Sequence, residues 1–418
     1  MASARDEVVV HLDASDLGPD QTVGTLRRER SASGGVMSFA YEPSWLAARG
    51  PFTLDPSLGL YEGEQYPPAL PGIFTDAAPD RWGRTLLERR EALAARRAER
   101  RPRPLDEWDF LVGVNDRVRM GALRFARVTD GTFIDDGPLS VPPSTYLRTL
   151  EHWAGEFEQG LPQTGGDEER WITMLIAPGS ALGGTRPKAN FIGDGDVLWI
   201  AKFPSREDRR DVGAWEYVVT RLAAAAGIDV PETTVLRLGS PYRTFCARRF
   251  DRLGDGRRLY ASAMTLVGKR DGEDASYLDV AQAIIYFADP AAIEADLQQL
   301  FRRVVFNVLT ADRDDHLRNH GFLRTREGWR LAPVFDINPA PEKAEHSLAL
   351  NETLRVPDLE VVRETAPLYR LSAARRDEII EEVRRAVAGW SQVARAAEIP
   401  SEEVELLAPA FEMVSNVG

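Results

Sequence analysis

Cysteine is almost absent from this sequence: its 418 residues include a single one, Cys246. One thiol cannot form a disulfide within the chain or supply a cysteine-based zinc site, so the sequence predicts a protein of a reducing compartment. Long apolar runs are also missing, and without 18 consecutive apolar residues we expect no membrane-spanning helix. The first residues, MASARDEVVV, carry charges where a signal peptide needs an apolar core. We therefore expect a cytoplasmic protein that does not contact a membrane.

Positive charge is in deficit. Lysine and arginine total 52 residues against 65 aspartates and glutamates, which gives a formal net charge of −13. A chain with this balance has no general positive field for nucleic acid, so contact with DNA would require a local basic patch or a partner protein. The apolar content of 43% is that of an ordinary globular protein, and the length predicts two or three modules.

The first third of the chain, residues 1–130, is predicted to be β-rich with short helices, and residues 131–165, in which Asp, Gly and Pro are frequent, are predicted to be a connection. Apolar and polar residues alternate in EVVVHLD, which predicts a strand over 7–13. The stretch TDAAPDRWGRTLLERREALAARRAERRPRP predicts a helix that Pro102 and Pro104 end. The densest basic run lies at the end of that helix and comprises Arg96, Arg97, Arg100, Arg101 and Arg103. Two interpretations of this run stay open, a solvated helix end or a docking patch for an acidic partner or DNA.

Residues 170–250 are predicted to mix strands with a helix, whereas the pattern from Asp279 onward predicts helices. The stretch ANFIGDGDVLWIAKFPS (189–205) predicts a hairpin, because Gly and Asp residues separate its two apolar runs. The stretch GAWEYVVTRLAAAAG (213–227) has the 3.6-residue period of an amphipathic helix, and several long segments after Asp279 share that period. The sequence therefore predicts an α+β protein in which a β-rich half precedes an all-helical half.

Four features that suit a phosphate and a metal follow one another along the chain. The first is the loop GSALGGTRPKANF (179–191), in which Gly183 and Gly184 would let backbone amides approach an anion. Arg186 and Lys188 add positive charge to this loop. By itself the pattern is weak evidence and is more typical of a plain hairpin turn.

The second feature is Lys202, which interrupts the apolar strand pattern LWIAKFPS. A lysine at such a position is costly to bury unless it is paired, and either phosphate oxygens or Glu216 would be suitable partners. The alternative is an edge-strand lysine that guards against aggregation.

The third and fourth features carry acidic residues. In DRDDHLRN (312–319), Asp314 precedes Asn319 by five residues, as in a kinase catalytic loop, where the Asp serves the acceptor hydroxyl and the Asn binds Mg²⁺. A capped, solvated turn is the alternative. Asp336 lies among apolar neighbours in APVFDINP (332–339) and would need an ionic partner such as a metal. Asp336 follows Asp314 by 22 residues, which leaves room for a short hairpin. A phosphate loop, a lysine, a base and a carboxylate for the metal thus follow one another in the chain, and this order predicts phosphoryl transfer.

The order of these motifs makes the chain resemble the HipA family of serine/threonine kinases, the toxin components of HipA–HipB toxin–antitoxin modules. The resemblance runs nearly end to end and is carried by SFAYEPSWL, GIFTDAAPDRWGRTLL, MGALRF, GSALGGTRPKA, LWIAKFPS, RRFDR, SYLDVA, DRDDHLRN and LAPVFDINP. It implies a HipA-like kinase fold. An accessory subdomain would occupy 1–140, a nucleotide-holding N-lobe 141–250, and a catalytic, all-helical C-lobe 251–418.

The resemblance also implies a role for each site residue, with ATP and Mg²⁺ as cofactors. Asp314 matches the catalytic Asp, Asn319 and Asp336 match the Mg²⁺ ligands, and Lys202 matches the phosphate-contacting lysine. The remaining matches are expected around the nucleotide: Gly183, Gly184, Thr185, Arg186 and Lys188 in the phosphate loop, Arg248 and Phe250 in the hinge segment ARRF, and His316 beside the catalytic Asp.

One position departs from the family pattern and bears on regulation. The family commonly has a Ser two residues before the paired glycines, and phosphorylation of that Ser ejects the loop and silences the kinase. Here Ala181 fills that position and Ser180 lies one residue upstream. We expect Ser180 to be phosphorylated slowly or not at all, with control passing mainly to a partner protein.

The implied partners are a protein substrate and a HipB-like helix-turn-helix antitoxin, through which alone the chain would contact DNA. Aminoacyl-tRNA synthetases are the target class known for the family. Two other functions stay open on the sequence. A catalytically weak HipA-like module could hold an antitoxin on operator DNA, although filled positions at Asp314, Asn319 and Asp336 argue against it. A metal-dependent phosphoesterase would need more histidines near the site than His316 and His320.

Overall fold

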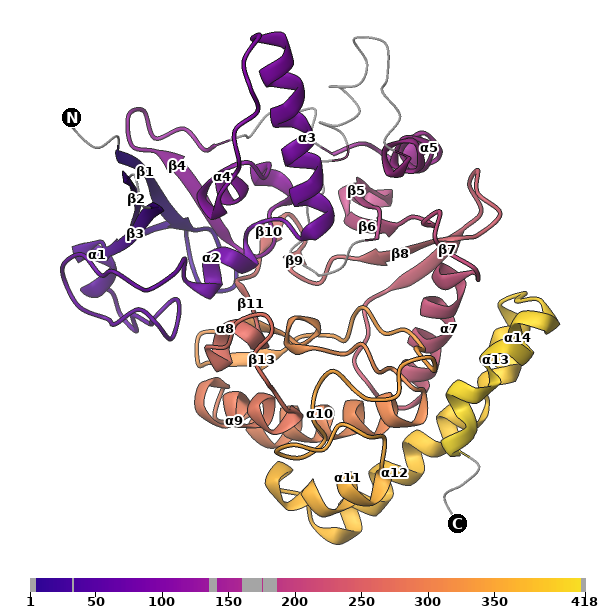
Figure 1. Ribbon diagram of the computed structural model, residues 1–418. Helices are drawn as coiled ribbons and strands as arrows, with labels where there is room; N and C mark the ends of the chain where they lie inside the picture. Colours follow the sequence, from indigo (N-terminus) through magenta and orange to yellow (C-terminus); the bar gives the residue numbers. More distant parts are fainter. Residues whose placement is uncertain (1–4, 32–33, 135–140, 160–174, 176–185, 415–418) are drawn as a thin grey trace. The chain divides into compact units, whose positions relative to one another are not determined.

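The computed structural model describes residues 5–31, 34–134, 141–159, 175 and 186–414. The chain, which Figure 1 colours by residue number, divides into two compact units. The N-terminal unit comprises Met1–Ala201 with Asp251–Ala261, and the C-terminal unit comprises Lys202–Phe250 with Ser262–Gly418. In the described ranges, no helix has both the length and the apolar character needed to cross a bilayer.

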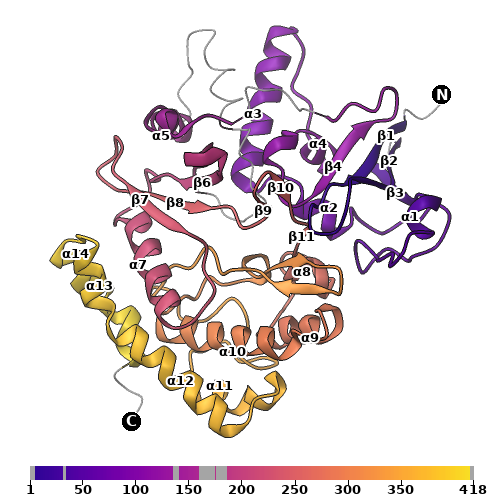
Figure 2. The ribbon, with the colours of Figure 1, turned by 180° about the vertical axis from the view of Figure 1, so that it is seen from behind.

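A four-stranded antiparallel sheet organises the N-terminal unit. Its strands are β1 (Arg5–Leu12), β2 (Gln21–Ser31), β3 (Gly34–Tyr41) and β4 (Leu123–Arg127), in the order β3-β2-β1-β4. Figures 1 and 2 show this sheet, coloured indigo to violet, from opposite sides. The predicted strand EVVVHLD forms most of β1. Val8, Val10 and Leu12 are buried together because alternate residues of a strand point to the same face.

Helices and short strands complete this unit. The predicted long helix is α3 (Arg81–Arg97), which begins where Asp80 accepts a hydrogen bond from the amide of Gly83 at 2.9 Å. The predicted hairpin strands are β5 (Lys188–Ile192) and β6 (Leu198–Lys202), which are neighbours in a sheet. The other elements are α1 (Pro43–Leu46), α2 (Gly72–Asp76), α4 (Glu107–Val112), α5 (Leu147–Glu158), β9 (Arg252–Leu253) and β10 (Gly256–Arg257).

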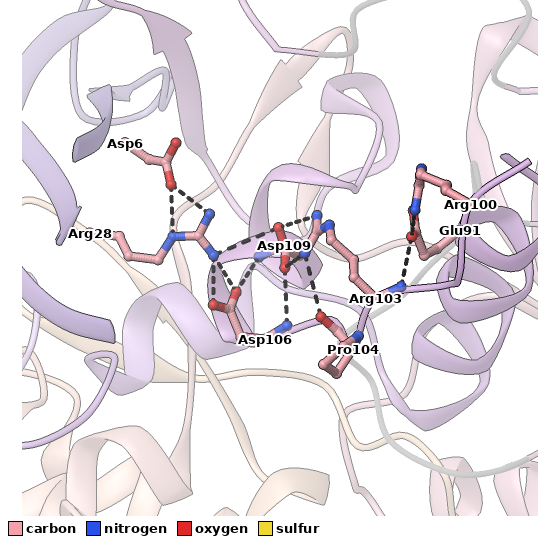
Figure 3. Close-up of polar contacts among 8 residues, drawn as sticks. All are labelled: Asp6, Arg28, Glu91, Arg100, Arg103, Pro104, Asp106 and Asp109. Atoms are coloured by element: carbon pink, nitrogen blue, oxygen red, sulfur yellow. Dashed lines mark hydrogen bonds and ion pairs between the residues drawn. The ribbon is translucent and has the colours of Figure 1, made fainter. Parts of the chain in front are cut away.

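The basic run at the end of α3 is partly neutralised within the same unit. Arg100 donates to Glu91 at 2.6 Å, and this hydrogen bond lowers the pKa of Glu91 to about 2. Arg103 donates to Asp109 at 2.6 Å, as Figure 3 shows. The run therefore presents less positive charge than its sequence suggests, which favours the solvated helix end over the docking patch.

Arg28 on β2 is almost fully buried and connects this sheet to α4. Its guanidinium donates to Asp6 at 2.6 Å and to Asp106 at 2.6 Å, and it lies 3.7 Å from Asp109 (Figure 3). The ring of Trp108 lies 5.3 Å from the guanidinium carbon, within cation–π range. Asp106 also caps the first turn of α4. One buried cation thus joins β1, β2 and α4.

The C-terminal unit is built mainly of helices. The predicted amphipathic helix is α7 (Val212–Ala225), and β7 (Thr233–Leu236) pairs antiparallel with β8 (Thr244–Arg248). Helix α10 (Ile293–Leu309) packs against α9 (Tyr277–Phe287) and α12 (Ala373–Ala388), as both views show. The unit's other main elements are α8 (Ala263–Val267), β12 (Gly321–Arg324), β13 (Trp329–Leu331), α11 (Leu359–Thr365), α13 (Trp390–Ala396) and α14 (Ser401–Leu407). Strand β11 (Tyr260–Ser262) ends at Ser262, where this unit's second segment begins.

The predicted α+β class is confirmed, with one refinement. The C-terminal region is helical but not all-helical, because the β12–β13 hairpin occupies the interval between Asp314 and Asp336, where the sequence left room for one. Neither compact unit coincides with the segments 1–140, 141–250 or 251–418, so this three-part division stays a prediction.

We expect Arg28→Met to lower the free energy of unfolding by about 3 kcal/mol, because the carboxylates around it would lose their shared cation. Urea unfolding followed by tryptophan fluorescence measures this. The matched control is Arg100→Met, which breaks an exposed pair and should lower the free energy of unfolding much less. Equal losses in the two variants would contradict the special role of Arg28.

Candidate active site

Lys202, the last residue of β6, is the centre of a buried ion-pair cluster in the C-terminal unit. Its ammonium donates to Glu216 of α7 at 2.5 Å and to Asp336 at 2.6 Å. Burial alone would lower the pKa of Lys202, but the charges of Asp336 and Glu216 raise it above its ordinary value. The lysine is therefore a permanent cation. Its burial between two carboxylates argues against the edge-strand alternative.

Asp336 has an unusual backbone conformation. Its φ of 61° lies in the left-handed region, which residues other than glycine seldom adopt. The flanking Val334 and Ile337 are buried, whereas the Asp336 side chain is 24% exposed and holds Lys202 on one oxygen. The ionic partner that the sequence required is thus present. Strain of this kind concentrates at functional sites, which makes Asp336 a candidate for a role beyond packing.

The acidic loop after α10 presents Asp314 to solvent. The loop begins at Ala311, whose φ of 49° is also left-handed, and ends in a short 3₁₀ turn, Leu317–Asn319. The Asp314 side chain is 66% exposed, and its Oδ1 accepts a hydrogen bond from the ammonium of Lys343. An exposed carboxylate on an ordered loop is accessible to a substrate hydroxyl, as a general base must be.

Asn319 closes this loop with an unsatisfied oxygen. The residue is buried, and within the described ranges its side-chain Oδ1 has no hydrogen-bond partner. A buried carbonyl oxygen without a partner costs free energy unless something else binds it. A hard cation such as Mg²⁺ is a suitable partner, since it prefers oxygen ligands. No group of three or more His, Cys, Asp or Glu suited to a metal occurs in the part of the chain that the structure describes.

The neighbouring Asp315 has the opposite environment to Asp314. It is buried and accepts hydrogen bonds from the hydroxyl of Tyr277 at 2.9 Å and from Asn307 at 2.7 Å, and Nε2 of His320 lies 2.8 Å away. Burial would raise the pKa of Asp315, but His320 and Tyr277 together hold it below its ordinary value. This network anchors the loop from inside. The sequence analysis missed it, because two adjacent aspartates carry no signal of which one points inward.

Asp312 adds a third carboxyl to the loop and is buried as well. Burial, and then the charges of Asp315, Asp336 and Asp314, raise the pKa of Asp312 well above its ordinary range. The surroundings of Asp312 therefore disfavour the charged form of its carboxyl.

The predicted hinge and His316 are also placed. Arg248 is exposed and lies 3.5 Å from the carboxylate of Glu232, and the ring of Phe250 lies 5.5 Å from that of Phe335. His316 is half-buried at the start of the 3₁₀ turn, and within the described ranges its Nδ1 has no hydrogen-bond partner. None of these contacts tests a role in nucleotide binding, which stays a prediction.

Most of the predicted phosphate loop, namely Ser180, Ala181, Gly183, Gly184 and Thr185, lies outside the described residues. Arg186 is half-buried. Lys188 is the first residue of β5 and donates to Asp80 at 2.5 Å, with both side chains buried. This bond gives Lys188 a structural partner in the N-terminal unit. Its predicted phosphate contact remains a prediction.

Comparison with known proteins identifies related families. A family model described as the HipA-like C-terminal domain matches residues 180–390, and one described as the HipA N-terminal domain matches residues 17–126. A protein of Haemophilus influenzae named a putative kinase is 26% identical over an alignment of 157 residues, and the match covers 33% of this chain and 45% of that protein. The match therefore spans less than half of that relative.

The fold is also similar to a solved structure, that of HipA from Shewanella oneidensis MR-1 in its complex with HipB and operator DNA. The TM-score is 0.65 at 17% sequence identity, and the alignment covers 97% of this chain and 95% of the other. Nearly the whole chain thus shares one fold with that protein.

His346 generates a prediction about pH. It is buried, and burial lowers its pKa to about 4. The pKa of His346 is lower in the folded state than in the unfolded state, so the unfolded state binds a proton first as the pH falls. The contribution of His346 to the free energy of unfolding is therefore fully present above about pH 6.5 and is lost as the pH falls toward 4. Between pH 7 and 4.5, the free energy of unfolding should fall in both proteins, but by about 2–3 kcal/mol less in His346→Gln than in the wild type. Urea unfolding at several pH values measures the difference. The exposed His152→Gln is the control, and parallel curves for wild type and His346→Gln would contradict the prediction.

Proposed function

The chain belongs to the HipA family, and on that premise we propose that it is an ATP- and Mg²⁺-dependent protein serine/threonine kinase. The observation that supports this best is the buried Lys202, whose ammonium contacts both Glu216 and Asp336. In protein kinases, phosphoryl transfer depends on a lysine that is paired with a helix glutamate and on an aspartate that binds the metal. The match to the C-terminal family model includes all three residues.

In this proposal, Lys202 and two oxygen ligands handle the nucleotide. Lys202 lies where its charge can be shared between Asp336 and phosphate oxygens, and Glu216 keeps it in place from the other side. Asn319 and Asp336 would hold Mg²⁺, which suits the unsatisfied Oδ1 of Asn319. When bound, Mg²⁺ neutralises phosphate charge and usually completes its shell with water and phosphate oxygens, so two protein ligands suffice.

Asp314 is the proposed base. Its exposed carboxylate would orient the serine or threonine hydroxyl of the acceptor and accept its proton as the bond to phosphorus forms. The neighbouring Asp315 would not reach a substrate, because it is buried and accepts hydrogen bonds from Tyr277 and Asn307 in the interior. The two aspartates therefore differ in their proposed roles because one is exposed and the other is buried.

The partners follow from the family rather than from the site. We propose a protein substrate, of which aminoacyl-tRNA synthetases are one candidate class, and a HipB-like antitoxin that mediates any contact with DNA. The net charge of −13 and the internally paired Arg100 and Arg103 are in keeping with an indirect contact. We further propose a cytoplasmic location, in keeping with the single cysteine, which is buried.

We expect Asp314→Asn and Asp336→Asn each to reduce phosphate transfer from ATP at least about a hundredfold, since each removes a charge that the reaction uses. The melting temperature should change little. Asn tolerates the left-handed backbone of position 336, so that variant isolates the loss of charge. Asp377→Asn, at an exposed position on α12, is the control for the assay. Transfer at the wild-type rate by either site variant would overturn the mechanism.

We expect Lys202→Ala to raise the KM for ATP and to lower kcat, with a combined loss of about a hundredfold in kcat/KM, because the lysine neutralises phosphate charge before and during transfer. Glu216→Gln keeps the contact between Lys202 and Asp336 and should cause a smaller loss. Steady-state kinetics over a range of ATP concentrations separates the two parameters. If Lys202→Ala leaves both unchanged, Lys202 has no part in handling the nucleotide.

A further inference from the structure

Lysine is scarce in this chain, and every lysine contacts a carboxylate. Of the 52 basic residues only four are lysines, at positions 188, 202, 269 and 343. The ammonium of Lys188 contacts Asp80, and that of Lys202 contacts both Glu216 and Asp336. The ammonium of Lys269 contacts Asp279, and that of Lys343 contacts Asp314. Lys and Arg are not interchangeable, because an ammonium binds at a single point whereas a guanidinium binds with a planar fork. The fourth pair is distinctive, since its carboxylate is the proposed base.

The backbone around Lys343 is attached to the acidic loop at several points. The amide of Ala340 donates to the carbonyl of Ala311 at 2.8 Å, and the amide of Lys343 donates to the carbonyl of Ala340 at 3.1 Å. The guanidinium of Arg313, the residue before Asp314, donates to the carbonyls of Pro341, at 3.2 Å, and Lys343. The turn that carries the ammonium is thus bonded directly to the loop that carries the carboxylate.

A second attachment lies just beyond Lys343. Both the amide and the hydroxyl of Ser347 donate to the carbonyl of Arg313, at 3.0 and 3.1 Å. The ion pair itself adds little to stability, because the Lys343 side chain is 42% exposed and that of Asp314 is 66% exposed. The surrounding hydrogen bonds to the backbone therefore fix the geometry of the Lys343–Asp314 pair, although the pair itself contributes little to stability.

We propose that Lys343 is a positioning residue for the phosphotransfer reaction, which holds Oδ1 of Asp314 so that Oδ2 faces the acceptor hydroxyl. This inference rests on the proposed kinase function. Within the described ranges, Oδ1 is the only oxygen of Asp314 with a hydrogen bond, so the second oxygen is available. A lysine leaves it available because it donates at one point. An arginine would tend to cover both oxygens with its fork.

The first test compares kinetics of variants at this position. Wild type, Lys343→Met, Lys343→Arg and Lys269→Met are assayed with γ-labelled ATP, with casein as acceptor and with transfer to the chain itself recorded. For Lys343→Met we expect kcat to fall about tenfold while the KM for ATP stays within about twofold, since one charge-assisted contact is lost away from the nucleotide. Lys343→Arg should also fall well below wild type. Lys269→Met, which breaks a pair at the start of α9, should keep full kcat.

The second test restores the ammonium chemically. In Lys343→Cys, the new thiol is alkylated with bromoethylamine, which returns an ammonium at nearly the original distance, or with iodoacetamide, which adds a neutral group. Cys246 does not compete, because it is buried and burial raises its pKa to about 12. The charged adduct should recover at least about half of the lost kcat, and the neutral adduct should recover none, as a role of the charge requires.

The outcomes separate the two levels of the argument. A wild type that transfers no phosphate to casein or to itself would overturn the proposed function and this inference together. An active wild type with unchanged kcat in Lys343→Met, or equal recovery by charged and neutral adducts, would overturn the role of Lys343 alone. Melting curves of all variants accompany the assays. A fall in kcat without recovery by the charged adduct would likewise count against positioning by the ammonium.

Discussion

The buried ammonium of Lys202 between Glu216 and Asp336 is the interaction on which the C-terminal unit depends. Lys202 and Glu216 are buried, so removing either one would leave a buried charge without its partner, whereas the Asp336 side chain is partly exposed to water. The cluster joins the end of β6, the first turns of α7 and the segment after β13, which are distant in sequence. It also accounts for the left-handed backbone of Asp336, since the ion pair offsets the conformational cost.

The acidic loop shows how one short segment can serve both packing and chemistry. Asp315 is held inside by Tyr277, Asn307 and His320, and this anchoring leaves its neighbour Asp314 exposed. Asp312 is buried, and burial and the neighbouring carboxylates raise its pKa. Adjacent acids in one loop thus differ in pKa and exposure because their surroundings differ, not because their side chains do.

Positive charge in this chain is used locally. In the N-terminal unit, Arg28 is surrounded by carboxylates, and two arginines of the basic run at the end of α3 have acidic partners close by (Figure 3). Such pairing keeps an acidic protein folded while leaving little free positive surface in those places. A direct, general attraction to nucleic acid therefore has weak physical support. An interaction through a partner protein, as we propose, does not require one.

The sequence by itself predicted the main regular elements and named the candidate site residues, whose roles stay predictions. Alternation in EVVVHLD and the helical period of 213–227 predict β1 and α7 because these patterns are local. Lys202 and Asp336 were predicted from a charge set among apolar residues, where a partner was needed, and the structure pairs them. Only the tertiary structure decided that Asp315 points inward, that Lys188 pairs with Asp80, and that Lys343 reaches Asp314. Each of these depends on contacts between segments far apart in the chain. The residues next to an aspartate or lysine in the sequence do not identify the side chain that contacts it in the folded protein.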